Sequence, residues 1–364
     1  MTIRRIHILI LIFSLIAIKA KAQSKFIDDL ELMINLHTGY NIPEYSMFTY
    51  LTEDYIHSVD LSIIKSTTGK NQWEQIFKYP QYGLSLFYSS LGNDDVFGRE
   101  ISTNLFFKVN LIYKEKFKLY NQLGVGLGYV NKVFDLNDNY MNVAVGSHVN
   151  LHFNYRLGCN FEFIKKTKIN LGISFDHFSN ANTSEPNLGI NYLTAFAGLS
   201  YTIGRISDKQ IQIIKPHIKK NNFEIIYNLG LKNSRALKAQ KYFTSSLSFE
   251  VKRESFRAFY LGLGLDLFYD SSVRDQLISA EKDYNTFDSF QTGIHFSQTL
   301  VYNKLSLTIQ EGVYMLLTEK VGEHIMYNRG IIRYQVNKKF SVRLSMKSHL
   351  HILDYPEFGI GYKL

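Results

Sequence analysis

The stretch KINLGISFDHFSNANTSEPNLGINYLTAFAGLSYTIG, residues 168–204, decides the fold of this chain. Its first part alternates apolar residues with polar or small ones. The apolar residues are Ile169, Leu171, Ile173 and Phe175, and the residues between and after them are Asn170, Gly172, Ser174 and Asp176. Residues 193–203 repeat this alternation. Side chains two residues apart on a β-strand share a face. The stretch therefore predicts two strands, each with one apolar face and one polar face.

Similar alternating segments recur along the chain, and many are about ten residues long or longer. These segments are rich in Tyr and Phe near their ends, as in the aromatic girdles of membrane barrels, and proline is scarce with only 5 residues. Short basic turns at 113–116, 165–168, 252–254 and 337–339 alternate with longer polar loops. These features favour an all-β, antiparallel transmembrane β-barrel of the outer-membrane type over a periplasmic β-sandwich.

The first 22 residues have the pattern of a secretory signal peptide. Arg4 and Arg5 precede an apolar run from 6 to 18, and Ala20-Lys21-Ala22 is a small-x-small cleavage site. The run is too short for a membrane-spanning helix, which needs about 20 residues. No cysteine lies directly after the run, so a lipoprotein anchor is not expected. We expect a mature chain that starts at Gln23 and is exported to the outer membrane of a Gram-negative cell.

Charge and cysteine content narrow the partners. The chain has 364 residues and a formal net charge of +9, which by itself is compatible with nucleic acid or an anionic surface. Export makes nucleic acid an unexpected partner. The single cysteine, Cys159, excludes a disulfide framework and a thiolate zinc site. No cofactor is implied by any motif.

The mature chain divides into two halves of about eight strands each. We expect a β-barrel over 23–204, a charged linker over 205–222 and a second strand unit over 223–364. The first half has strands at about 31–40, 54–66, 80–90, 99–113, 116–131, 143–163, 167–180 and 189–204. Residues 67–79 do not fit a short periplasmic turn. The pattern leaves open one barrel of about sixteen strands, and the charged linker favours two separate units.

One cluster of polar residues stands out from the rest of the chain. His177 and Ser179 lie two apart on a predicted strand and share its apolar, lipid-facing side. Asn191 opens the next strand in the same register. A hydroxyl beside an imidazole is the minimum for an activated serine nucleophile. The alternative is an ordinary hairpin, because Ser-Asn is also common turn chemistry.

The strand count predicts the depth of this cluster. In an even-stranded barrel with periplasmic termini, odd-numbered strands run outward. The strand that ends at Ser179 is the seventh, so we expect the cluster at the outer-leaflet interface. In a Gram-negative envelope that leaflet is lipopolysaccharide, whose ester-linked acyl chains lie near this depth.

The segments HFSNAN, 177–182, and EPNLGIN, 185–191, resemble the signature of the lipid A 3-O-deacylases, the PagL-type outer-membrane esterases also called acyloxyacyl hydrolases. The close match covers about fifteen residues, and residues 31–204 fit that family's eight-stranded barrel, whereas the C-terminal half is expected to lie outside it. The resemblance implies that Ser179 is the nucleophile, that His177 is the general base and that Asn180 helps to stabilise the oxyanion.

The third catalytic residue departs from the family pattern. The best-known members carry a glutamate that orients the histidine, and the matching position here is Asn191. An amide can orient an imidazole but cannot stabilise the imidazolium by charge. Glu185 is the substitute candidate, whereas Asp176 is expected to point into the lumen.

The function expected from these residues is hydrolysis of an ester-linked 3-hydroxyacyl chain from lipid A of lipopolysaccharide. Two alternatives remain at this point: an esterase that acts on phospholipid, and a non-enzymatic channel, transporter or adhesion platform. A homodimer is left open. Asp266 and Asp270, near an outer loop, are possible cation ligands, but solvated loop acids are the simpler interpretation.

Overall fold

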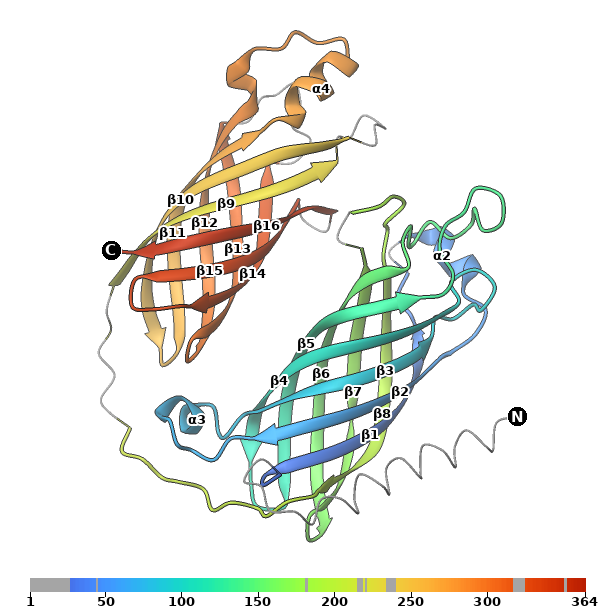
Figure 1. The fold of residues 1–364 in the computed structure, drawn as a ribbon, viewed down its shortest axis with the longest axis vertical. Helices are drawn as coiled ribbons and strands as arrows, with labels where there is room; N and C mark the ends of the chain where they lie inside the picture. The colour runs from blue at the N-terminus through green and yellow to red at the C-terminus, as the bar shows by residue number, and fades with distance from the viewer. Residues whose placement is uncertain are drawn as a thin grey trace. The chain divides into compact units, whose positions relative to one another are not determined.

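The computed structural model describes residues 27–43, 45–180, 183–214, 219, 221–233, 240–316, 325–349 and 352–364. The predicted signal peptide and its cleavage site lie outside these residues, as do Ala181 and Asn182 of the hairpin motif. Two compact units make up the chain, and their division falls near residue 213. Each unit contains one closed, antiparallel β-barrel of eight strands (Figure 1).

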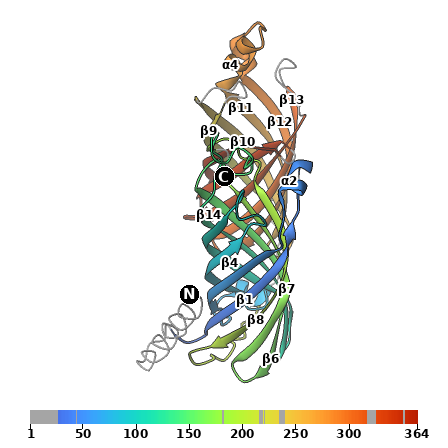
Figure 2. The ribbon, with the colours of Figure 1, turned by 90° about the vertical axis from the view of Figure 1, so that its right-hand side faces the viewer.

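The first barrel closes because its first strand pairs with its eighth, Leu32 opposite Tyr201. Figure 2 shows its strands, blue to green, tilted against the barrel axis. Its strands are β1 (Leu30–Asn41), β2 (Ile56–Ser66), β3 (Gln81–Ser90), β4 (Arg99–Tyr113), β5 (Phe117–Val130), β6 (Val149–Ile164), β7 (Thr167–Ser179) and β8 (Ile190–Thr202). Two short helices lie in its connections, α2 (Ser46–Leu51) and α3 (Gln72–Ile76).

The second barrel closes through the pairing of its first strand with its last, Ile225 opposite Tyr362. Its strands are β9 (Asn221–Asn233), β10 (Lys241–Phe256), β11 (Phe259–Asp270), β12 (Phe290–Tyr302), β13 (Leu305–Leu316), β14 (Met326–Gln335), β15 (Phe340–His349) and β16 (Ile352–Lys363). The connection between β11 and β12 carries helix α4 (Ser272–Ser279) and the 3-10 turn η1 (Thr286–Ser289).

Both barrels bury polar side chains and expose apolar ones, the reverse of a water-soluble protein. In the first, Asp60 and Arg156 form an ion pair inside the lumen, whereas Leu105 is 67% exposed on the outside. In the second, Arg329 is 1% exposed and Leu263 is 63% exposed. An apolar exterior around a polar interior is what a bilayer requires of a barrel. No helix among the described residues is long and apolar enough to span a membrane.

The strand predictions need three refinements. The sequence left one barrel or two open, and the structure has two closed barrels. The irregular segment 67–79 contains α3 and so is a real elaboration of the β2–β3 connection. Strand β6 begins at Val149 and not at 143, because the side chains of Ala144 and Val145 are fully buried in an apolar cluster.

That apolar cluster closes one end of the first barrel. It joins the long β1–β2, β3–β4 and β5–β6 connections to the last residues of β7 and the first of β8. Its buried members are Phe48, Ile56, Phe87, Leu91, Val96, Phe97, Val130, Ala144, Val145, Phe178, Ile190 and Tyr192. The β7–β8 hairpin therefore turns against a packed surface.

Candidate active site

The polar cluster lies where β7 ends and β8 begins. His177 is paired directly with Asn191 across the two strands, and Phe178 is paired with Ile190. Alternation along β7 places His177 on the outer face with Ile173 and places Asp176 inside, where it is fully buried. The hairpin thus brings His177, Ser179 and Asn191 together on the outside of the barrel.

A continuous chain of hydrogen bonds links the three side chains. His177 Nδ1 lies 2.6 Å from Asn191 Oδ1, and His177 Nε2 lies 3.0 Å from Ser179 Oγ. The amide oxygen can only accept, so Nδ1 carries the proton and donates it to Asn191. Nε2 then presents its lone pair to the hydroxyl proton of Ser179. This is the tautomer in which a histidine can serve as base for a serine.

Phe178, between the histidine and the serine, fixes the hairpin from inside. Its side chain is fully buried, 4.1 Å between ring centroids from His152, and nearly parallel to the ring of Tyr192. Tyr192 in turn donates to Glu100 Oε1 at 3.2 Å. Inward packing on both strands therefore restrains the outward residues that alternate with it.

The remaining predicted residues are placed as follows. Asn180 is buried, and its backbone N–H donates to Asn187 Oδ1 at 2.8 Å. Asn187 belongs to the quoted motif, but no role for it followed from spacing alone. Glu185 is exposed, while the Nδ1 atom of His177 is occupied by Asn191. Asp176 contacts His152 in the lumen at 2.9 Å.

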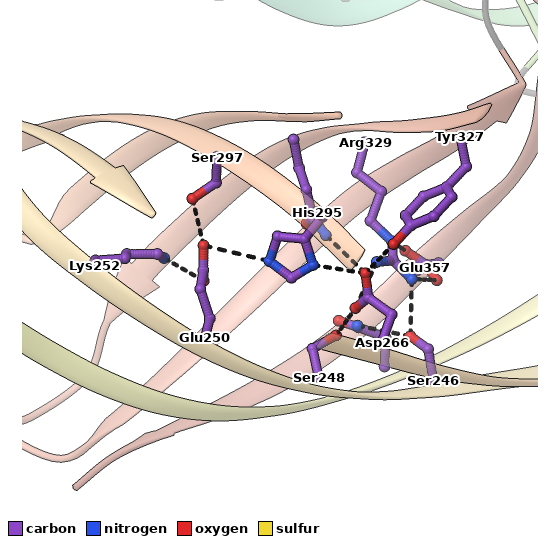
Figure 3. Close-up of polar contacts among 12 residues, drawn as sticks. Ser246, Ser248, Glu250, Lys252, Asp266, His295, Ser297, Tyr327, Arg329 and Glu357 are labelled. Carbon is purple, nitrogen blue, oxygen red and sulfur yellow. Dashed lines mark hydrogen bonds and ion pairs between the residues drawn. The ribbon is translucent and has the colours of Figure 1, made fainter. Parts of the chain in front are cut away.

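The second barrel contains the same three letters in a different orientation. His295, Phe296 and Ser297 lie on β12, but here the histidine and serine face the lumen (Figure 3). His295 Nδ1 contacts Asp266 at 2.7 Å, and Ser297 donates to Glu250 and not to a histidine. A shift of one residue in register decides which face a pair occupies. This inward pair is part of the barrel interior.

The interpretation of Asp266 and Asp270 as solvated loop acids is wrong. Asp266 is 1% exposed and bonds to His295, Tyr327 and Ser248 inside the second barrel (Figure 3). Asp270 is buried and paired with Lys232. Both carboxylates are held by basic side chains and hydrogen-bond donors of the second barrel. The sequence pattern alone did not reveal these partners.

Comparison with known proteins agrees with the sequence resemblance. Residues 57–200 match the family model described as lipid A 3-O-deacylase (PagL), and residues 221–364 match that of the acyloxyacyl hydrolase C-terminal domain. No curated protein sequence matches the chain significantly. The expectation that the second half lies outside the family is corrected by its own match.

Several solved structures also resemble the chain. The outer-membrane enzyme PagL is 16% identical over 46% of this chain and 97% of its own, with a TM-score of 0.33. Neisserial surface protein A is 9% identical over 48% and 97%, with a TM-score of 0.34. OccAB4 of Acinetobacter baumannii is 10% identical over 92% and 98%, with a TM-score of 0.26. At such scores the fold rests on the strand pairing itself.

The inverted barrels and the Ser–His–Asn cluster at a hairpin define the class of the chain: a β-barrel protein of the outer-membrane type. Within that class, residues 57–200 are similar to the lipid A 3-O-deacylase (PagL) family, and residues 221–364 are similar to the acyloxyacyl hydrolase C-terminal domain. These are families of ester hydrolases.

Proposed function

We propose that this protein is an outer-membrane ester hydrolase that removes an ester-linked 3-hydroxyacyl chain from lipid A of lipopolysaccharide. The observation that carries the proposal is the hydrogen-bond chain from Asn191 through His177 to Ser179. It lies on the outer face of the barrel, within the residues that match the deacylase model. Ser179 follows His177 in the outward row of β7, and it is 7% exposed. A nucleophile on this outward side of the hairpin suits a substrate that is itself a membrane lipid.

The proposed reaction has two steps. His177 Nε2 takes the hydroxyl proton while Ser179 Oγ bonds to the ester carbonyl carbon. The tetrahedral intermediate collapses, the glucosamine oxygen leaves with the proton from His177, and an acyl-serine remains. Water, deprotonated by His177, then attacks the acyl carbon, and Ser179 regains its proton as the 3-hydroxy fatty acid departs.

Two asparagines support this chemistry in the proposal. Asn191 holds the imidazole in the reactive tautomer through its Oδ1 atom, 2.6 Å from Nδ1. Asn180, directly after the nucleophile, stabilises the oxyanion. One well-aligned oxyanion donor lowers the activation free energy by about 3 kcal/mol. Because Asn191 is neutral, the imidazolium formed during attack is not paired with a charge at that position.

The test compares lipid A from cells that express the wild-type chain with lipid A from cells that express Ser179→Ala. Mass spectrometry should show loss of one hydroxyacyl chain with the wild type only. Equal lipid A in both, with both chains assembled in the outer membrane, contradicts the proposal. If the wild type removes acyl chains from phospholipid and not from lipid A, the protein is a phospholipid esterase, and lipid A as its substrate is wrong.

A further inference from the structure

The connection between β5 and β6, residues 131–148, forms backbone hydrogen bonds with the β7–β8 hairpin. Leu188 N donates to Val143 O at 3.3 Å, and Gly189 N donates to Ala144 O at 2.9 Å. These two bonds hold the segment that leads into β8. Ala144, Gly189 and Asn191 also line one shared recess. The connection therefore restrains the backbone of residues 188–189, directly before β8 and Asn191.

Gly189, which is restrained in this way, lies next to the side chain of His177. Its φ is +77°, a backbone conformation that favours glycine. A Cβ atom built on Gly189 would lie 3.0 Å from His177 Cε1 and 3.1 Å from Phe178 O. The Gly189 backbone therefore lies next to the imidazole edge, and the hydrogen bond from Gly189 N to Ala144 O holds this backbone.

Asn142, the residue before Val143, anchors this part of the connection. Asn142 is fully buried, and its Nδ2 donates to Val96 O at 3.0 Å and to Lys132 O at 3.1 Å. Its Oδ1 accepts from Val145 N at 3.4 Å. A single amide therefore ties the β3–β4 connection, the base of the β5–β6 connection and the turn at 145 together.

We infer that Asn142 is a positioning residue for the catalytic histidine, acting through the Val143–Ala144 backbone and Gly189. It touches no reacting atom. Its effect is to keep the imidazole at the distance from Ser179 and Asn191 that proton transfer needs. The inference rests on the proposed esterase function and adds a residue outside the His-x-Ser motif.

The test uses the full-length chain in detergent with purified lipid A as substrate. Asn142→Ala should lower kcat by roughly 10- to 100-fold and leave KM within about 2-fold, because small displacements of catalytic groups can cost about 100-fold in rate. Gly189→Ala should give the same pattern from the other end of the restraint. Heat-modifiable migration, which closed barrels retain, should be unchanged in both.

Asn139→Ala is the matched control. Asn139 lies in the same connection, and its Nδ2 donates to Val96 O and Val133 O, each at 2.9 Å. Its loss removes the same kind of bond without directly releasing Val143 or Ala144, so kcat should stay within about 3-fold of wild type. A general loosening of the loops would lower kcat equally in Asn142→Ala and Asn139→Ala, and that result overturns the inference.

The inference and the proposed function fail in different ways. If wild type releases acyl chains, Ser179→Ala does not, and Asn142→Ala matches wild type, the positioning role is wrong and the esterase stands. If wild type is inactive, both are wrong. Should Asn142→Ala not assemble, Gly189→Ala decides alone, and a wild-type kcat for that variant overturns the inference.

Discussion

By its resemblance to the deacylase signature, Asn191 takes the position of a glutamate in the best-known family members, and substitution of this one residue tests what the difference does. Its amide oxygen, 2.6 Å from His177 Nδ1, selects the correct histidine tautomer but supplies no negative charge. Asn191→Ala should lower kcat by up to about 10⁴-fold, the loss known when a triad's orienting residue gives the wrong tautomer.

Asn191→Glu should preserve or raise kcat, since a carboxylate keeps the hydrogen bond and stabilises the imidazolium. Kinetics of the two variants on lipid A, with heat-modifiability as the folding control, checks the pair. Full activity of Asn191→Ala together with an inactive, folded Asn191→Glu would exclude position 191 as the third catalytic residue.

The placement of these three side chains on one outer face could be predicted from sequence, because alternation with period 2 is local. Counting from Ile173 along β7 puts His177 outside and Asp176 inside, and the structure has both there. The restraint from Asn142 could not be predicted. Its partners Val96 and Lys132 lie in irregular connections, where no periodicity reports which backbone groups meet.

At the scale of elements, a buried ion pair ties β2 to β6 across the lumen of the first barrel. Asp60 is fully buried, Arg156 is 1% exposed, and the two side chains are directly bonded. Removal of one partner leaves an uncompensated charge in the interior, which typically costs about 3–5 kcal/mol. Asp60→Ala should therefore destabilise the first barrel strongly, and Asp60→Leu combined with Arg156→Met should cost much less.

The single tryptophan of the chain makes this prediction measurable. Trp73 lies in α3 of the first barrel, so its fluorescence during denaturant unfolding follows that unit. Glu357→Ala is the matched control, because it removes the partner of Arg329 in the second barrel. A Trp73 transition that moves equally with Asp60→Ala and Glu357→Ala would contradict the assignment.

The β5–β6 boundary shows why elements next to the site were harder to predict than those within the strands. Residues 143–145 are apolar, which is also what a lipid-facing strand requires, so the pattern extended β6 too early. In the structure Ala144 and Val145 are instead buried beneath the connections at the end of the barrel. Composition alone does not separate an apolar residue that faces lipid from one that faces a packed loop.

At the scale of the whole molecule, the sequence predicted about sixteen strands but did not decide how they close. Closure depends on pairs such as Leu32 with Tyr201, which are far apart in the chain. The resulting eight-stranded barrels are only wide enough for side chains to fill. Inside the second, Arg329 bonds to Glu357 at 2.8 Å, and Asp266 is surrounded by donors (Figure 3).

Filled lumens predict that the protein does not conduct ions. Purified chain inserted in planar lipid bilayers should give no stable open-channel steps, with a large porin as the positive control for insertion. Reproducible single-channel currents from a heat-modifiable preparation would instead support the channel alternative and would require a lumen different from the one described.

The most direct test of the central claim is hydrolysis of lipid A by the purified full chain in water enriched in ¹⁸O. Attack by Ser179 and hydrolysis of the acyl-serine should place one ¹⁸O in the carboxyl group of the released 3-hydroxy fatty acid and none in the freed glucosamine hydroxyl. Ser179→Ala should release nothing. Absence of released fatty acid from the folded wild-type protein, or equal release by Ser179→Ala, would contradict the account.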